Sequence, residues 1–408
     1  MIAQTANPIP NRSARALLAY VHSGFVLAGA VSVLLGPILP FLAARWSLTD
    51  SQTGKFFLAQ FFGAILGVTI SSFTLPRRGY RISFLFGLSM ISIGLATMGH
   101  GTFGATLASI FCFGAGLGLH SASTNLWVGE MKDSTRAGSL NLVNFSWTVG
   151  AMSCPLLVLL FTAQGGLFGL LWTLAAFSAA LALASCAIPL DPPRSFSADE
   201  ATNHQIDDAQ TPALFRDPAT YLFAAIFFFE LGTENAVGGW LATYSKRVLA
   251  SDSAAWTITP SIFWGGLALG RALAPFVLKR LSELRVVQLG LLLSILGTFT
   301  WLESSTAPGI FIGALVSGLG LASIFPILMS WLVEHCGVQA RRVGGQMLGI
   351  GILGGAIIPW LIGILSTHFA SLRTGISIIF FVLALNFVLF SAAYRLLHSR
   401  KPAPSYQP

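Results

Sequence analysis

Charged residues are scarce in this chain. Asp, Glu, Lys and Arg make up 9% of its 408 residues, whereas hydrophobic residues make up 54%. Soluble domains contain about 25% charged residues, so this chain lacks the ions that would cover a surface facing water. The composition excludes a soluble enzyme and favours a protein whose surface faces lipid.

Cysteine is also rare. The chain has 4 cysteines, which lie in or at the ends of apolar segments at unrelated spacings: Cys112, Cys154, Cys186 and Cys336. Disulfide frameworks and zinc sites need regular, paired spacings. We therefore interpret the four as packing residues and expect neither a metal nor any other cofactor.

Nucleotide-binding motifs are lacking as well. No glycine-rich loop ends in Gly-Lys-Ser or Gly-Lys-Thr, which argues against ATP-driven pumping. Gly349–Gly354 matches the letters of the dinucleotide motif G-x-G-x-x-G, but it lies inside an apolar segment and follows no strand. Its small residues are typical of closely packed membrane helices. The short basic turns follow from membrane topology, so no nucleic-acid partner is expected.

Long apolar runs dominate the chain. A helix needs about 20 mostly apolar residues to cross the hydrocarbon of a bilayer. Runs of this kind predict an all-α membrane protein of twelve transmembrane helices. They lie near residues 16–44, 53–75, 82–99, 103–128, 138–162, 167–190, 219–245, 254–278, 285–302, 307–333, 343–365 and 374–397.

One long polar stretch divides these helices into two sets of six. It covers residues 191–218 and is rich in proline and carboxylates. We predict an N-terminal six-helix bundle at 1–190, a cytoplasmic linker at 191–218 and a C-terminal six-helix bundle at 219–408.

Lys and Arg gather in alternate turns between the apolar runs. Arg77 and Arg78 follow span 2, and Lys279 and Arg280 follow span 8, whereas the opposite turns hold few basic residues. Because cytoplasmic loops carry an excess of Lys and Arg, both termini are predicted to be cytoplasmic. We expect a monomer in the lipid bilayer of a bacterial inner membrane.

The two halves resemble each other at a nearly constant offset. The matching positions are Gly36 with Gly239, Gly67 with Gly270, Gly116–Leu119 with Gly318–Leu321, Gly150 with Gly354, and Pro155 with Pro359. Parallel repeats place a transporter's solute site between the halves, near the bilayer midplane. The repeat therefore predicts two six-helix pseudo-repeat bundles that expose one site to each side in turn.

The twelve spans, the linker, the repeat and the basic turns make the chain resemble the major facilitator superfamily over nearly its whole length. The loop Trp46–Gly54 is similar to the loop that follows span 1 in that superfamily. Between spans 2 and 3, Arg77 and Arg81 keep the basic residues of the superfamily signature, whereas Pro76 replaces its aspartate. The resemblance implies a twelve-helix transporter without the gate contact usual at that aspartate.

Spans 7 and 8 carry a more specific mark. Gly232–Tyr244 contains Gly-Thr-Glu, Gly-Gly-Trp and Thr-Tyr, and Phe263–Arg271 follows in span 8. Both segments are similar to those of sodium-dependent glucose transporter 1-like proteins and of fucose–galactose–glucose proton symporters. Span 1 lacks the acidic residue of the sugar symporters and offers only Tyr20, His22 and Ser23. The resemblance therefore implies a sugar as solute and leaves the coupling mechanism open.

Ionisable residues inside the spans are the candidates for coupling and gating. Glu230 and Glu234 are four apart, hence on one face of span 7, and a charge at membrane depth usually faces a cavity, a partner or a proton path. Glu234 is the candidate for proton coupling, with sodium as the alternative ion. Arg271 could act as a gate or pair with either glutamate for structure alone. His120 could relay a proton, contact a sugar or simply pack in the core.

Polar and aromatic residues of both halves are the candidates for solute binding. Sugars need paired donors and acceptors for their hydroxyls and an aromatic face for their C–H surfaces. The residues that could supply these are Asn125, Asn141, Asn144, Trp147, Asn235, Trp240 and Gln346. The same amides could instead form hydrogen bonds between helices.

Three functional hypotheses follow. The first is a secondary transporter that moves a small neutral polar solute, a sugar, by alternating access coupled to a proton at Glu234. The alternative is a major facilitator exporter of drugs or other metabolites. Span 5 argues against it, since only Gly150 and Pro155 of the antiporters' repeated glycine–proline signature are present there. The third is a receptor that binds solute without moving it, which the short tails do not favour.

Overall fold

The computed structural model describes residues 11–129, 136–164, 166–188, 190, 217–249, 254–337 and 340–399. Across these residues the regular secondary structure is helical, and no strand occurs in them. The predicted all-α class is confirmed.

The described helices belong to two compact units. Unit 1 covers the described residues of Met1–Leu34 and Phe62–Arg194. Its helices are α1 (Asn11–Val33), the part of α3 (Asp50–Met98) from Phe62 onward, α4 (Phe103–Gly129), α5 (Arg136–Ala163) and α6 (Leu167–Ala187).

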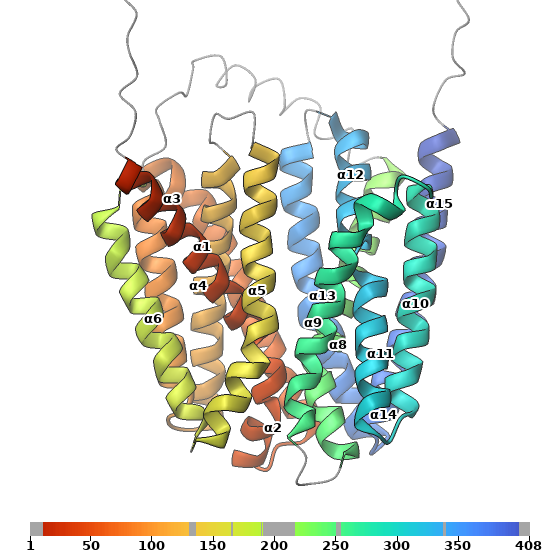
Figure 1. The fold of residues 1–408 in the computed structure, drawn as a ribbon, viewed down its shortest axis with the longest axis horizontal. Coiled ribbons are helices and arrows are strands. Elements are labelled where there is room, and N and C mark those ends of the chain that lie inside the picture. The colour runs from red at the N-terminus through yellow and green to blue at the C-terminus, as the bar shows by residue number, and fades with distance from the viewer. Residues whose placement is uncertain are drawn as a thin grey trace, which may run out of the picture. The chain divides into compact units, whose positions relative to one another are not determined.

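Unit 2 covers the described residues of Leu35–Phe61 and Ser195–Pro408. Its helices are α2 (Leu35–Arg45), the first part of α3, α8 (Pro218–Val248), α9 (Ala255–Val277), α10 (Glu283–Glu303), α11 (Ala307–Leu321), α12 (Ile324–Cys336), α13 (Ala340–His368), α14 (Leu372–Ile376) and α15 (Ile378–Ser399). Within each unit the long helices run alongside one another (Figure 1). Residues 191–216 of the predicted linker lie outside the described part, so the predicted domain boundaries stay predictions.

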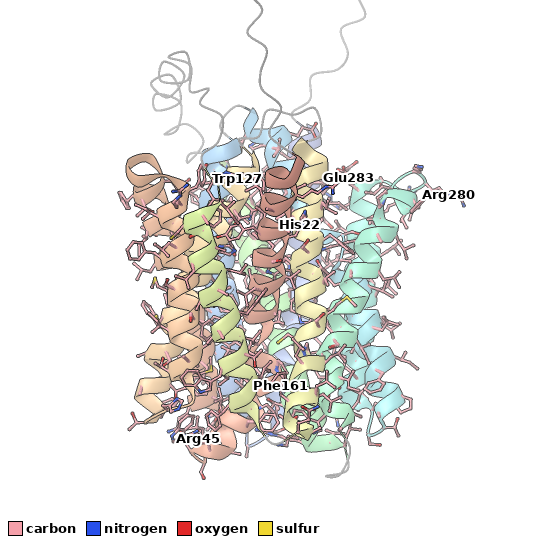
Figure 2. All side chains as sticks on the ribbon, turned by 60° about the vertical axis from the view of Figure 1, so that its left-hand side comes forward. His22, Arg45, Trp127, Phe161, Arg280 and Glu283 are labelled. Atoms are coloured by element: carbon pink, nitrogen blue, oxygen red, sulfur yellow. The ribbon has the colours of Figure 1, made fainter. Side chains whose placement is uncertain are left out.

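The described helices have the lengths and composition needed to cross a bilayer. Ten helical stretches in this part of the chain are both long and apolar enough. α8 and α9, with 31 and 23 residues, are also long enough but are more polar, because they carry Glu230, Glu234 and Arg271. The ten apolar stretches together with α8 and α9 correspond to the twelve predicted spans. In Figure 2, Arg45 lies at one end of the unit 2 helices, and Arg280 and Glu283 lie at the other.

Prolines divide two of the predicted spans. Where 16–44 was predicted as one helix, α1 ends at Val33 and α2 begins at Leu35. Proline has no N–H, so Pro37 leaves the carbonyl of Val33 without its helical partner. The span predicted at 307–333 is likewise divided into α11 and α12, and Pro326 has the same effect on the carbonyl four residues before it.

The predicted turn between spans 2 and 3 is present as a sharp kink in α3. The two apolar stretches Asp50–Leu75 and Gly79–Met98 meet there, and Gly79 has a non-helical backbone, with φ 74° and ψ 176°. This conformation suits glycine, which has no Cβ to clash.

The repeated glycines make matching helix contacts in the two units. In unit 1, a Cβ on Gly150 of α5 would lie 1.9 Å from the carbonyl oxygen of Val26 in α1. In unit 2, a Cβ on Gly354 of α13 would lie 1.8 Å from the carbonyl oxygen of Phe228 in α8. Since only glycine lets two backbones approach this closely, the contacts confirm the repeat in spans 1 and 5 and in spans 7 and 11.

Candidate functional site

Helix α8 carries the acidic residues of the candidate site. It starts at a well-defined N-terminus, where the side chain of Asp217 accepts a hydrogen bond of 3.1 Å from the N–H of Ala219 and Pro218 occupies the first turn. Much of the helix is buried, and its glycines allow close packing: Gly232 packs against α13, Gly238 against Trp264 of α9, and Gly239 against Phe57 of α3.

Glu234 and Arg271 form an ion pair between α8 and α9. The Nη2 atom of Arg271 lies 3.8 Å from Oε2 of Glu234, and the two side chains are 31% and 13% exposed. The contact is an ion pair without a short hydrogen bond. One of the pairings anticipated for Arg271 is thus present, and the roles of both residues in gating and coupling stay predictions.

Glu230 is in a different environment one turn earlier. Its side chain is fully buried, and within the described residues neither of its carboxyl oxygens has a hydrogen-bond partner. The charges that act on it are those of Glu234 and Arg271. Among the described residues, Nε of Arg271 also lacks a hydrogen-bond partner.

The other predicted residues of unit 2 are only partly available to a solute. Trp240 is fully buried, and its Nε1 donates a hydrogen bond of 2.8 Å to the carbonyl of Pro359 in α13. Asn235 is half-buried and donates from Nδ2 to the carbonyl of Leu231 at 2.8 Å. Gln346 is exposed. The structure thus gives Trp240 a packing role in this state, and its contact with solute stays a prediction.

The predicted residues of unit 1 lie on α4 and α5. His120 is buried, with its ring 6.2 Å from that of Phe25 and 5.4 Å from that of Phe84 between centroids. Asn125 is exposed and donates from Nδ2 to the carbonyl of Ser121 at 3.1 Å in its own helix.

On α5, Asn144 is exposed and Trp147 half-buried. The side chain of Asn141 lies outside the described part. Solute binding by the unit 1 set stays a prediction.

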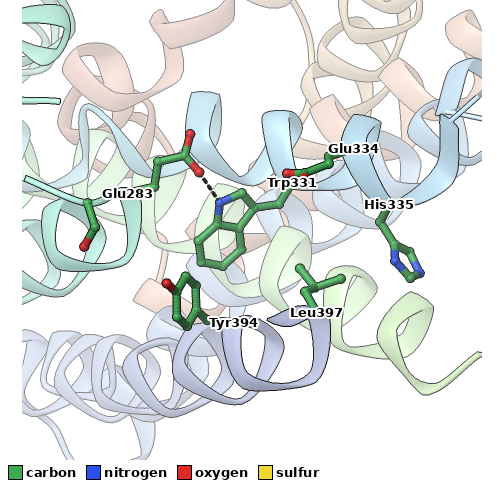
Figure 3. Close-up of a pocket in the computed structure, with 7 residues that line it drawn as sticks. Glu283, Trp331, Glu334, His335, Tyr394 and Leu397 are labelled. Carbon is green, nitrogen blue, oxygen red and sulfur yellow. Dashed lines mark hydrogen bonds between the residues drawn. The ribbon is translucent and has the colours of Figure 1, made fainter. Parts of the chain in front are cut away.

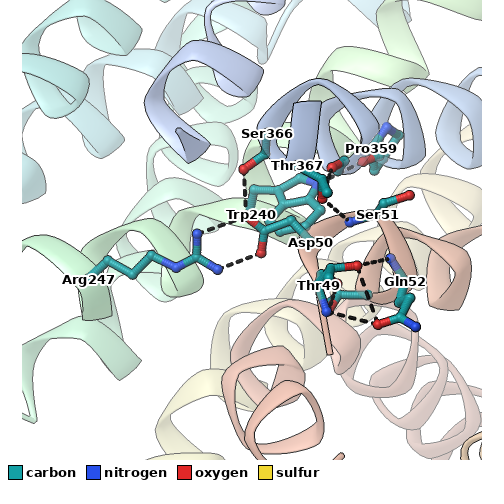
Figure 4. A network of polar contacts seen from close by, with 11 residues as sticks. Thr49, Asp50, Ser51, Gln52, Trp240, Arg247, Pro359, Ser366 and Thr367 are labelled. Atoms are coloured by element: carbon teal, nitrogen blue, oxygen red, sulfur yellow. Dashed lines mark hydrogen bonds and ion pairs between the residues drawn. The ribbon is translucent and has the colours of Figure 1, made fainter. Parts of the chain in front are cut away.

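A polar network that the sequence analysis did not anticipate joins α3, α8 and α13 in unit 2. Asp50 accepts hydrogen bonds from both Nη atoms of Arg247, at 2.8 and 2.5 Å, and from Oγ of Ser366 at 2.5 Å (Figure 4). The N–H of Ser51 donates to Oγ1 of Thr367 at 2.8 Å. We call the set Asp50, Ser51, Arg247, Ser366 and Thr367 the Asp50 network.

Local sequence explains why Asp50 is in place. Thr49 and Gln52 form a reciprocal capping box at the start of α3. The N–H of Thr49 donates to Oε1 of Gln52 at 3.0 Å, and the N–H of Gln52 donates to Oγ1 of Thr49 at 3.3 Å. The Thr-x-x-Gln spacing was a readable signal for the helix start, whereas the partner Arg247 is 197 residues away.

A pocket of about 370 Å³ lies near the ends of α10, α12 and α15. Figure 3 shows the indole N–H of Trp331 pointing to Glu283, a hydrogen bond of 2.5 Å, with Tyr394 beside the ring. None of the predicted solute or coupling residues lines this pocket.

Residues 21–350 match the family described as the Major Facilitator Superfamily. The chain belongs to the major facilitator superfamily. This result confirms the predicted family and shows a transporter rather than an enzyme.

The chain is also similar to curated relatives and to solved structures. Sodium-dependent glucose transporter 1A of Mus musculus is 22% identical over 92% of this chain and 96% of its own length. A putative glucose/galactose transporter of Helicobacter pylori is 24% identical over 82% and 85%. The predicted resemblance to glucose-transporter relatives is confirmed.

Among solved structures, an inward-facing, unoccupied bacterial homolog of the human lysosomal transporter Spinster has a TM-score of 0.79, with 14% identity over 97% of this chain and 100% of its own. A D-xylose-proton symporter has a TM-score of 0.74, with 16% identity over 94% and 97%. At these identities the structures show the fold.

Proposed function

We propose that this transporter moves a sugar across the membrane by alternating access and couples the movement to a proton through Glu234. The observation that carries the coupling is the group formed in α8 and α9 by the buried Glu230 and the partly exposed pair of Glu234 and Arg271. Ionisable residues inside a membrane span are costly and are usually retained for ion or proton pathways. Sodium remains the alternative ion.

The solute class rests on the relatives and on the polar residues. The relatives are named as glucose and glucose/galactose transporters. The candidate lining combines amides with indole rings and carries no fixed charge, which suits a neutral polyol. An exporter of drugs or other metabolites is the second candidate, because the fold is compatible with export as well as with uptake.

Orientation and location belong to the same proposal. Both termini are cytoplasmic, and the membrane is a bacterial inner membrane. The uneven distribution of Lys and Arg supports the orientation.

Ligand-dependent stability and counterflow test the proposal together. The purified protein is melted in the presence of hexoses, pentoses, amino acids, organic anions and amphipathic drugs. A bound ligand raises the melting temperature by mass action, so we expect a rise with one or more sugars. Counterflow of the same labelled sugar in proteoliposomes then separates a transporter from a receptor. Stabilisation by drugs and not by sugars would favour the exporter.

A further inference from the structure

We propose that Glu230, Glu234 and Arg271 form a site that binds a single proton, in which Glu230 holds the proton while Glu234 balances the charge of Arg271. The proposal deepens the proposed proton coupling and rests on it. It moves the proton from Glu234, which the sequence favoured, to the neighbouring glutamate one turn away.

The surroundings of Glu230 accommodate a neutral acid and not a carboxylate. The side chain is fully buried, and neither oxygen has a hydrogen-bond partner within the described residues. An ionised carboxylate without such partners is strongly destabilised, because it has lost its hydration and gained no hydrogen bonds in return. A bound proton removes that charge.

Charge balance gives the number of protons. Arginine keeps its positive charge in proteins, and Arg271 already has Glu234 at 3.8 Å. One carboxylate neutralises one guanidinium, so a second carboxylate, on the buried Glu230, would leave these three residues with a net negative charge inside a membrane span. The group is neutral when one of its two carboxyl groups carries a proton.

In the described part of unit 2, no charge other than those of Glu234 and Arg271 acts on Glu230. Arg271 on α9 and Glu234 on α8 itself are the charged groups that act on Glu230 among the described residues. Beside Leu231, the residue that follows Glu230, α13 has a glycine: a Cβ on Gly351 would lie 2.8 Å from Cδ2 of Leu231. Phe227 of α8 meets Phe325 of α12, with ring centroids 6.0 Å apart.

Arg271 gives the site a way to release its proton. Its Nε has no hydrogen-bond partner within the described residues, so the guanidinium has a free donor. If Arg271 moves from Glu234 toward Glu230, it favours the ionised form of Glu230. The O–H bond of Glu230 then breaks, its proton passes to Glu234 or to water, and the total charge of the group plus proton is conserved.

Infrared difference spectroscopy of the purified protein counts the bound protons, because a neutral carboxylic acid and a carboxylate have different carbonyl bands. At neutral pH we expect one neutral-acid band from this site. Glu230→Gln should remove it. Glu234→Gln should also remove it, because Arg271 then has only Glu230 as its partner and keeps Glu230 ionised. Arg271→Gln should double the band, and Arg271→Lys should leave it unchanged.

Glu334→Gln, at an exposed glutamate of α12, is the matched control and should leave the band unchanged. A wild-type protein without the band, a band that survives Glu230→Gln, or a band that survives Glu234→Gln overturns the proposal. If Arg271→Gln does not fold, the spectra of the two glutamate variants still test the proposal.

The spectra are independent of transport, so the two proposals fail separately. The expected bands in a protein that accumulates no sugar would leave the proton site standing and refute the proposed function. Proton-driven sugar accumulation, together with neutral-acid bands that do not change in either glutamate variant, would support the proposed function and refute the proton site.

Discussion

Individual side chains of α8 have distinct environments although they share one helix. Glu230 is buried without a hydrogen-bond partner in the described part of the chain, Glu234 faces Arg271, and Trp240 is fixed to Pro359. These differences set what each substitution should do. A carboxyl group that carries the coupling ion can be replaced by a neutral amide without loss of the solute site, whereas a carboxyl group that holds helices together cannot.

Glu234→Gln tests coupling at the residue scale. Whether Glu230 or Glu234 carries the coupling proton, the variant removes the carboxylate that pairs with Arg271. Sugar exchange between equal pools should therefore survive, and uphill accumulation driven by a pH gradient should fall to the level of the gradient-free control. Both are measured on the same proteoliposomes, with Glu334→Gln as control.

Two other outcomes would assign Glu234 differently. Loss of exchange and accumulation together, with a lower melting temperature, would indicate a structural role. Normal accumulation at normal expression would remove Glu234 from the coupling mechanism.

The sequence pointed to the three ionisable residues of spans 7 and 8 because any charge is conspicuous in an apolar run. It could not say which glutamate meets Arg271, since both lie on the same helix face. It also placed Trp240 in the solute lining from its motif. The hydrogen bond to Pro359 depends on how α8 and α13 are packed, which spacing along one chain does not reveal.

At the scale of elements, close helix contacts and one polar network hold α8 in place. The α8–α13 contact repeats the α1–α5 contact of unit 1 through the same glycine position. The Asp50 network joins the start of α3 to the C-terminal ends of α8 and α13. The repeat made the first feature predictable. The second joins residues at the ends of helices that are far apart in sequence, so no local pattern indicated it.

Gly354→Ala tests the packing. The added Cβ would meet the carbonyl oxygen of Phe228 at 1.8 Å, so α8 and α13 would have to separate. We expect a destabilisation of about 3 kcal/mol or more, seen as loss of the monodisperse peak in size-exclusion chromatography. Gly345→Ala, in the same helix with nothing within 4 Å of the added Cβ, should leave the peak unchanged. Equal yields of both variants would contradict the contact.

A double-mutant cycle tests the Asp50 network. The Arg247 side chain is 47% exposed, so solvent screens the pair and we expect a coupling of about 1 kcal/mol with Asp50. Asp50→Asn and Arg247→Gln should each lower the melting temperature, and the double variant should melt close to the single variants. Lys55→Gln, at an exposed cation on the second turn of α3, is the control. Fully additive losses would show that the two side chains act separately.

For the whole molecule, the account requires a fixed orientation in the membrane. Single cysteines are introduced at Ala44 and Lys279, both exposed, in a protein whose four native cysteines are replaced. In intact cells, an impermeant maleimide should label Ala44→Cys from outside, and Lys279→Cys should react only after the membrane is opened. The reverse pattern would invert the predicted topology.

The central claim is that the protein accumulates a sugar at the expense of a proton gradient. Proteoliposomes are given an inward proton gradient, and uptake of the labelled sugar that stabilises the protein best is followed over time. The account predicts a transient accumulation above the external concentration that disappears with a protonophore and is absent in Glu230→Gln and Glu234→Gln. Uptake that only equilibrates the sugar, at the same rate with and without the gradient, would contradict it.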